Sequence, residues 1–153
     1  MTRSGKFTLD IDPAKIATAQ QKGIDFDRRR VYTKRKLRSA NRAIITLTRV
    51  WMQRPESLWP RHSTPATLKL AFFYAIPKTR LVRHGKLPAL SDGQPCTAAW
   101  AGDLDNKAKA VIDAMVQAGI FRDDRDITVL TLAKAYTAGN PRIEVEVGKA
   151  AEP

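Results

Sequence analysis

Apolar and polar residues alternate along four stretches of the chain, and this period of two predicts four β-strands. The strands are expected over residues 7–11, 67–76, 127–136 and 142–147. The residues expected to share one face are Leu68, Leu70, Phe72, Tyr74 and Ile76 in the second strand, and Ile127, Val129, Thr131 and Ala133 in the third. A turn signal at residues 138–141 separates the last two strands, so we expect these strands to pair as a hairpin.

Apolar residues recur at spacings of three and four in two further stretches, which predicts helices over residues 34–53 and 104–118. Thr33 is the expected N-cap of the first helix, and Gly119 is the expected end of the second. The residues expected to face inward are Leu37, Ala40, Ile44, Leu47 and Trp51 in the first helix, and Leu104, Ala108, Val111, Ile112 and Met115 in the second. The order β-α-β-α-β-β predicts an α/β fold, α+β-like in arrangement, in which two main helices pack on a small mixed β-sheet.

The length of the chain matches one ordinary domain, so residues 1–153 are expected to form a single domain. Within it we expect residues 1–30 to be partly irregular, residues 77–102 to form a long basic loop, and residues 149–153 to form a tail. Structureless loops of this length are usually functional or disordered, and this one contains four cations. We therefore interpret it as a flap that contacts DNA.

Several classes of protein are disfavoured by composition. No apolar run approaches the length of a membrane span, and the N-terminal residues do not form an apolar signal core. Cys96 is the single cysteine and lacks neighbours at zinc-ligand spacing, and His62 and His84 are the only histidines. We expect a cytoplasmic protein with no membrane partner and no small-molecule cofactor.

The net charge of +12 and its distribution point to a polyanionic partner, most commonly nucleic acid. Between Arg28 and Lys86 the only acidic residue is Glu56. Cations open the first predicted helix, where the helix dipole disfavours them, and a bound polyanion would offset that cost. The alternative is a solvated basic face. The candidate DNA-binding residues are Arg28, Arg29, Arg30, Lys34, Arg35, Lys36, Arg38, Lys78, Arg80, Arg83 and Lys86.

An acidic cluster follows this basic half of the chain. Asp103 and Asp105 open the second predicted helix, and a turn through Gly119 can return Asp123 and Asp124 to their side. Lys109 lies one helical turn after Asp105. Mg²⁺ prefers a few carboxylate oxygens together with water and phosphate oxygens, and such a cation can activate water against a phosphodiester. The alternative interpretations are helix capping, a solvated acidic surface and an ordinary ion pair between Asp105 and Lys109.

The spacing of this cluster resembles the RusA family of Holliday junction resolvases. The similarity covers residues 100–136. Its motif consists of Asp103-Leu104-Asp105-Asn106, then Lys109, Asp113-Ala114, Ala118-Gly119 and Asp123-Asp124. Gly102 and Lys107 depart from the residues common in the family, and the loop over residues 77–102 is longer than in compact members. None of these departures removes a catalytic group.

The resemblance implies that Asp103, Asp105 and Asp124 bind Mg²⁺, for which Mn²⁺ can substitute, and that Lys109 is catalytic without binding the metal. We place Asn106 and Asp123 beside this site, where they would orient the metal ligands. The resemblance also implies a homodimer that resolves four-way junctions by paired nicks during DNA recombination and repair. Such proteins are frequently encoded by phages or prophages.

Three other functions are compatible with the same residues. The chain could be a nuclease that prefers flaps or other branched DNA, and a panel of substrates would separate that activity from junction resolution. It could also be a non-catalytic, architectural DNA-binding dimer, although the presence of all three aspartates and Lys109 disfavours this. An RNA-binding accessory protein is supported by charge alone.

Overall fold

The computed structural model describes residues 4–16, 23–25, 30–32, 35–54, 65–82 and 88–150. Its main sheet consists of β1 (Ser4–Leu9), β4 (Ala66–Ala75), β5 (Ile127–Thr137) and β6 (Arg142–Lys149). Its two long helices are α1 (Arg35–Met52) and α2 (Leu104–Ala118). A separate two-stranded ribbon consists of β2 (Gly23–Asp25) and β3 (Arg30–Tyr32). Four short 3-10 turns complete the described structure: η1 (Pro13–Lys15), η3 (Lys78–Arg80), η4 (Ala99–Ala101) and η5 (Asp124–Asp126).

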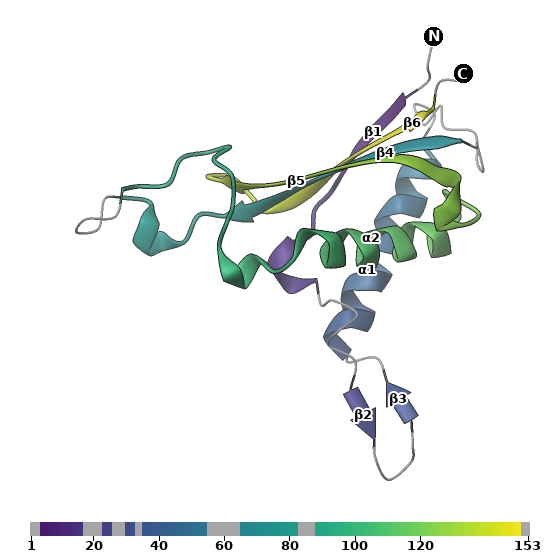
Figure 1. Ribbon diagram of the computed structural model, residues 1–153, viewed down its shortest axis with the longest axis horizontal. Helices are drawn as coiled ribbons and strands as arrows, with labels where there is room; N and C mark the ends of the chain where they lie inside the picture. The colour runs from purple at the N-terminus through teal and green to yellow at the C-terminus, as the bar shows by residue number, and fades with distance from the viewer. Residues whose placement is uncertain are drawn as a thin grey trace.

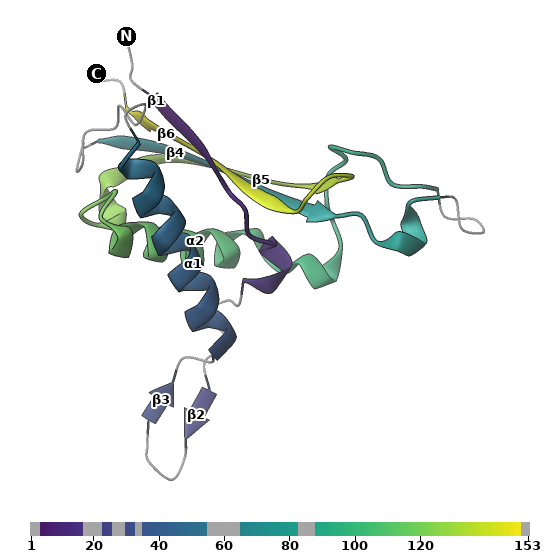
Figure 2. The same cartoon turned by 180° about the vertical axis from the view of Figure 1, so that it is seen from behind.

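The predicted mixed sheet with two helices is confirmed, and both helices lie on the same face of the sheet (Figures 1 and 2). The core lies between these two layers, because the apolar face of each strand and the apolar stripe of each helix point toward each other. The predicted face of β4 is fully inside, since Leu68, Leu70, Phe72, Tyr74 and Ile76 are all buried. No described helix is long and apolar enough to cross a membrane.

The strand order is β1-β6-β4-β5, so the predicted hairpin between the last two strands is wrong. β5 runs parallel to β4, and β6 runs antiparallel to the other edge of β4. A parallel pair requires a crossover connection, which α2 supplies between β4 and β5. The turn after β5 then carries the chain past β4, so that this strongly apolar strand lies inside the sheet between two neighbours.

The predicted face of β5 is correct only in part. A register shift lies between Ala66 and Thr67, where Ala66 pairs with Ile127 but Thr67 pairs with Val129. The extra residue turns Ile127 to the helix side of the sheet, where it lines a pocket together with Leu130 and Leu132. Val129 lies on the opposite face and is 52% exposed.

The N-terminal region and the long loop contain more structure than the sequence predicted. The ribbon β2–β3 lies within or beside the segment expected to be irregular, and it projects beyond the N-terminal end of α1 (Figure 1). Loop residues 93–96 form backbone hydrogen bonds with the outer edge of β5, including Cys96 N–H to Lys134 O at 3.1 Å. Lys149 belongs to β6 and not to a tail. The expected N-cap Thr33 and the side chain of Leu37 lie outside the described residues.

Candidate active site

The two aspartates of the predicted DxD pair lie at the N-terminal end of α2. Asp103 is the N-cap residue by backbone conformation, with φ −76° and ψ 133°, but its side chain makes no capping hydrogen bond. Its Oδ2 instead accepts a hydrogen bond from the Nδ2 of Asn106 at 3.3 Å. Helix capping by its side chain therefore does not account for Asp103, whose carboxylate instead contacts Asn106.

The backbone that leads into α2 is held from several sides. The buried hydroxyl of Tyr74 donates a hydrogen bond to the carbonyl of Ala101 at 3.0 Å, and Lys134 Nζ donates to the carbonyl of Gly102 at 3.0 Å. Burial raises the pKa of Tyr74, so its hydroxyl remains a donor. Gly102 itself has a φ of 74°, a conformation that favours glycine. These contacts fix the direction in which the chain presents Asp103.

Lys107 is a buried cation on the inner side of α2 and is only 5% exposed. Its ammonium group donates hydrogen bonds to the carbonyls of Pro13, at 3.0 Å, and Ile16. Burial lowers the pKa of Lys107, and the negative charge of Asp12 opposes that shift. This departure from the family motif thus has a structural role, because Lys107 connects the start of α2 to η1 and to the chain that leads into β2.

The second half of the acidic cluster follows the end of α2. Gly119 ends the helix in the left-handed conformation, with φ 91°, and its N–H donates to the carbonyls of Met115 and Val116. This confirms the predicted stop and reverses the chain toward η5 and β5. As a result, Asp124 at the start of η5 faces the same pocket as Asp105 of α2.

This pocket has a volume of about 440 Å³ and lies between α2, η5 and β5. Its polar walls include Asp105, Lys109 and Asp124, and its apolar walls include Ile112 and Leu132. Asp103, at the end of α2, does not line it. Three of the four residues expected to be catalytic therefore line one pocket, although Asp124 is 15 or more residues away in the sequence from the other two.

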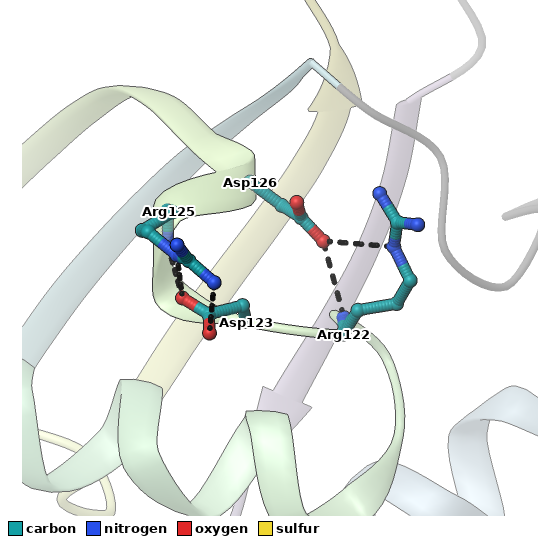
Figure 3. A network of polar contacts seen from close by, with 4 residues as sticks. All are labelled: Arg122, Asp123, Arg125 and Asp126. Atoms are coloured by element: carbon teal, nitrogen blue, oxygen red, sulfur yellow. Dashed lines mark hydrogen bonds and ion pairs between the residues drawn. The ribbon is translucent and has the colours of Figure 1, made fainter.

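Two aspartates close to Asp124 in the sequence form ion pairs with arginines (Figure 3). Asp123 accepts the Nε of Arg125 at 3.0 Å and its NH2 at 3.2 Å, as well as the Arg125 backbone N–H at 3.0 Å. These hydrogen bonds from Arg125 hold the pKa of Asp123 well below its usual range. Asp126 accepts the backbone N–H of Arg122 at 3.2 Å and lies 3.6 Å from its Nε. Both pairs fix the shape of η5.

Lys109 pairs with Asp113, with 3.6 Å between Nζ and Oδ1. The alternative interpretation of Lys109 as the ion-pair partner of Asp105 is therefore wrong. Once the three acids with cationic partners are set aside, Asp103, Asp105 and Asp124 remain. None of these three forms an ion pair with another described residue.

The donor set suits a hard divalent cation, which prefers carboxylate oxygens and completes its shell with water and phosphate. No group of three potential ligands among the described residues is already close enough to hold a metal ion. Carboxylates repel one another in the absence of a cation, so the side-chain rotamers that bring them together are those that the ion itself stabilises.

The predicted DNA-binding cations are only partly described. Arg38 and Lys78 are exposed, whereas Arg80 is half-buried and its NH2 donates to the carbonyl of Pro88 at 3.1 Å, which braces the loop. Arg30 lies in β3, and residues 35 and 36 open α1. The residues that lie outside the described part of the chain are Arg28, Arg29, Lys34, Arg83 and Lys86.

Sequence reasoning missed the residues that support the site from other elements. Tyr74 and Lys134 come from neighbouring strands, and Lys107 lies on the buried side of α2. For Lys107 a signal was present, because a lysine two residues before Lys109 on a helix cannot share its face. For Lys134 the sequence contained no signal, because its position opposite the buried Phe72 follows from the pairing of β5 with β4.

A comparison with protein families identifies the chain over most of its length. The family model described as Endodeoxyribonuclease RusA matches residues 13–148. A search of curated proteins found no significant match.

Proposed function

Because the chain belongs to the RusA endodeoxyribonuclease family, we propose that it is a divalent-metal-dependent nuclease that resolves four-way DNA junctions by paired nicks. The activity as a DNA endonuclease follows from the family. The metal ion, the residues that bind it, the paired nicks and the dimer are parts of the proposal. We also propose a cytoplasmic location, where such DNA substrates form.

One observation supports the assignment of the site. Of the six acids between residues 103 and 126, three have a cationic partner. The other three are Asp103, Asp105 and Asp124, and these are the acids that the family motif assigns to the metal. Asp105 and Asp124 line the same pocket, and a bound divalent cation would supply a positive charge that no ion pair of the described residues gives them.

Asp103, Asp105 and Asp124 would hold Mg²⁺ or Mn²⁺. When bound, such an ion polarises the phosphodiester, activates water and stabilises the leaving 3′-oxygen. Asn106 orients the Asp103 carboxylate, and Asp123 shapes η5 so that Asp124 faces the pocket. Lys109 lines the same pocket, where its ammonium group can exchange Asp113 for the negative charge that develops on the phosphate.

The proposed substrate is held through its phosphates by the basic half of the chain. A homodimer with one site in each subunit would place two sites on opposed strands of a junction, which accounts for paired nicks. A nuclease that prefers flaps would use the same groups, so this second candidate differs only in the DNA that fits between the two sites.

The test is incubation of the protein with labelled four-way junction, flap and linear duplex in Mg²⁺, in Mn²⁺ and in EDTA. We expect the junction to be cut on opposed strands with either metal, and EDTA to abolish cutting while binding persists. Asp124→Asn should bind the junction and fail to cut it. Glu146→Gln removes the same charge from the opposite face of the sheet, where Glu146 pairs with Lys6 and Lys69, and should cut normally.

Cleavage in EDTA would contradict the metal assignment. Preferential cleavage of flaps would replace the junction as substrate but leave the site intact. Normal cleavage by Asp124→Asn would show that the acidic pair after Gly119 is a surface feature, and the proposed site would then be wrong.

A further inference from the structure

Trp100 is an exposed aromatic residue beside the proposed active site. It lies in η4, three residues before Asp103, and is 50% exposed. The other large hydrophobic residues that are exposed in the described part of the chain are all aliphatic. Half of the surface of Trp100 is thus accessible to a ligand.

The segment that carries Trp100 is held in place on both sides. Its ring meets the ring of Tyr74 edge to face, with centroids 5.6 Å apart and an interplanar angle of 79°. The next two carbonyls, of Ala101 and Gly102, accept hydrogen bonds from Tyr74 and Lys134. Ala101 itself is completely buried. The indole is therefore presented to solvent in a defined orientation and loses little conformational entropy when it contacts a ligand.

We propose that Trp100 is a stacking platform for an unstacked base of the branched substrate and so contributes to the preference for junctions over linear duplex. This inference rests on the proposed function, because the scissile phosphate must lie at Asp103. Three residues span at most roughly 10 Å, which corresponds to about three base steps of 3.4 Å. A base near the cut is thus within reach of the indole.

The chemistry of the two DNA forms explains the selectivity. In an intact duplex each base is stacked between its neighbours, and its faces are not available to a side chain. At a branch point or in a single strand, stacking is interrupted, and an aromatic ring can cover the free face of a base. An exposed aromatic ring beside the proposed catalytic carboxylates therefore favours the binding of DNA with unstacked bases, whatever the base sequence.

The experiment measures dissociation constants in EDTA, where no cutting occurs, for a four-way junction, a single strand and a linear duplex of related sequence. Trp100→Ala should weaken binding of the junction and the single strand on the order of 5- to 150-fold and leave duplex binding unchanged. Trp100→Phe retains an aromatic ring and should restore most of the affinity. The control is Val50→Ala, which removes an apolar side chain of similar exposure, 47%, from α1 and should change none of the three constants.

An equal loss for all three DNAs would overturn the proposal, because the indole would then serve general binding or folding. No loss would overturn it as well. A change in the oligomeric state of Trp100→Ala would show that the ring contacts a second protein chain instead of a base. If the wild-type protein cuts no junction, the proposed function fails, but the single-strand arm still decides whether Trp100 stacks on bases.

Discussion

Lys107→Met tests whether a buried ammonium group holds the N-terminal segment onto α2. The substitution keeps the length and the packing of the side chain but removes the donor to the carbonyls of Pro13 and Ile16. Both hydrogen bonds involve a charged donor, and such bonds each contribute about 1.5–3 kcal/mol to stability. Removal of a buried cation offsets part of this loss, since its desolvation cost disappears as well.

We therefore expect Lys107→Met to lower the free energy of unfolding by about 2–4 kcal/mol. A typical domain is stabilised by roughly 5–15 kcal/mol, which exceeds this loss. The variant should therefore be clearly less stable but still fold at 25 °C. Urea denaturation followed by circular dichroism measures the change. Cleavage by trypsin after Lys15 should also become faster, because η1 loses its attachment to α2.

The control is Lys109→Met, which makes the same chemical change two residues further along α2. The Lys109 side chain is 60% exposed and makes one surface ion pair, so its loss should cost less than about 1 kcal/mol. If Lys107→Met is no less stable than Lys109→Met, and trypsin cleaves both at the same rate, the buried hydrogen bonds of Lys107 do not hold this segment.

Three further predictions concern catalysis, binding and backbone strain. Lys109→Ala should slow single-turnover cleavage about a hundredfold, and equal rates for this variant and wild type would exclude a catalytic role. The control is Lys69→Ala, which should cut at the wild-type rate. Lys69 is equally exposed, at 59%, and pairs with Glu146 at the same 3.6 Å distance. Replacement of the arginine run 28–30 by alanine should reduce the salt dependence of junction affinity by roughly 0.9 log units per lost phosphate contact, and an unchanged slope would place these arginines away from DNA. Gly102→Ala should cost about 1–3 kcal/mol in urea denaturation, because its φ of 74° favours glycine and a Cβ would lie 3.3 Å from Lys107 Cε; a fully stable variant would show that this turn is not strained.

Local sequence signals were sufficient where neighbouring residues decide the structure. The bounds of α2 follow from its apolar period and from Gly119, whose positive φ ends the helix. The same residues placed the acidic groups at the two ends of that helix, so both halves of the candidate site were predicted. The buried face of β4 was equally evident, because alternation assigns side chains to faces without knowledge of the neighbouring strands.

Only the tertiary structure decided how these elements combine. The insertion of β4 between β5 and β6 depends on which strand edges meet, and alternation carries no information about edges. The one-residue register shift in β5 arises from its pairing with β4, and it moves Ile127 to the other face. Likewise, the sequence contains six acids between residues 103 and 126. The turns and rotamers of the folded chain determine which three of them pair with a cation. Electrostatic partners are set by distances of a few ångströms, and such distances exist only after the helix, the turn and the strand have packed together.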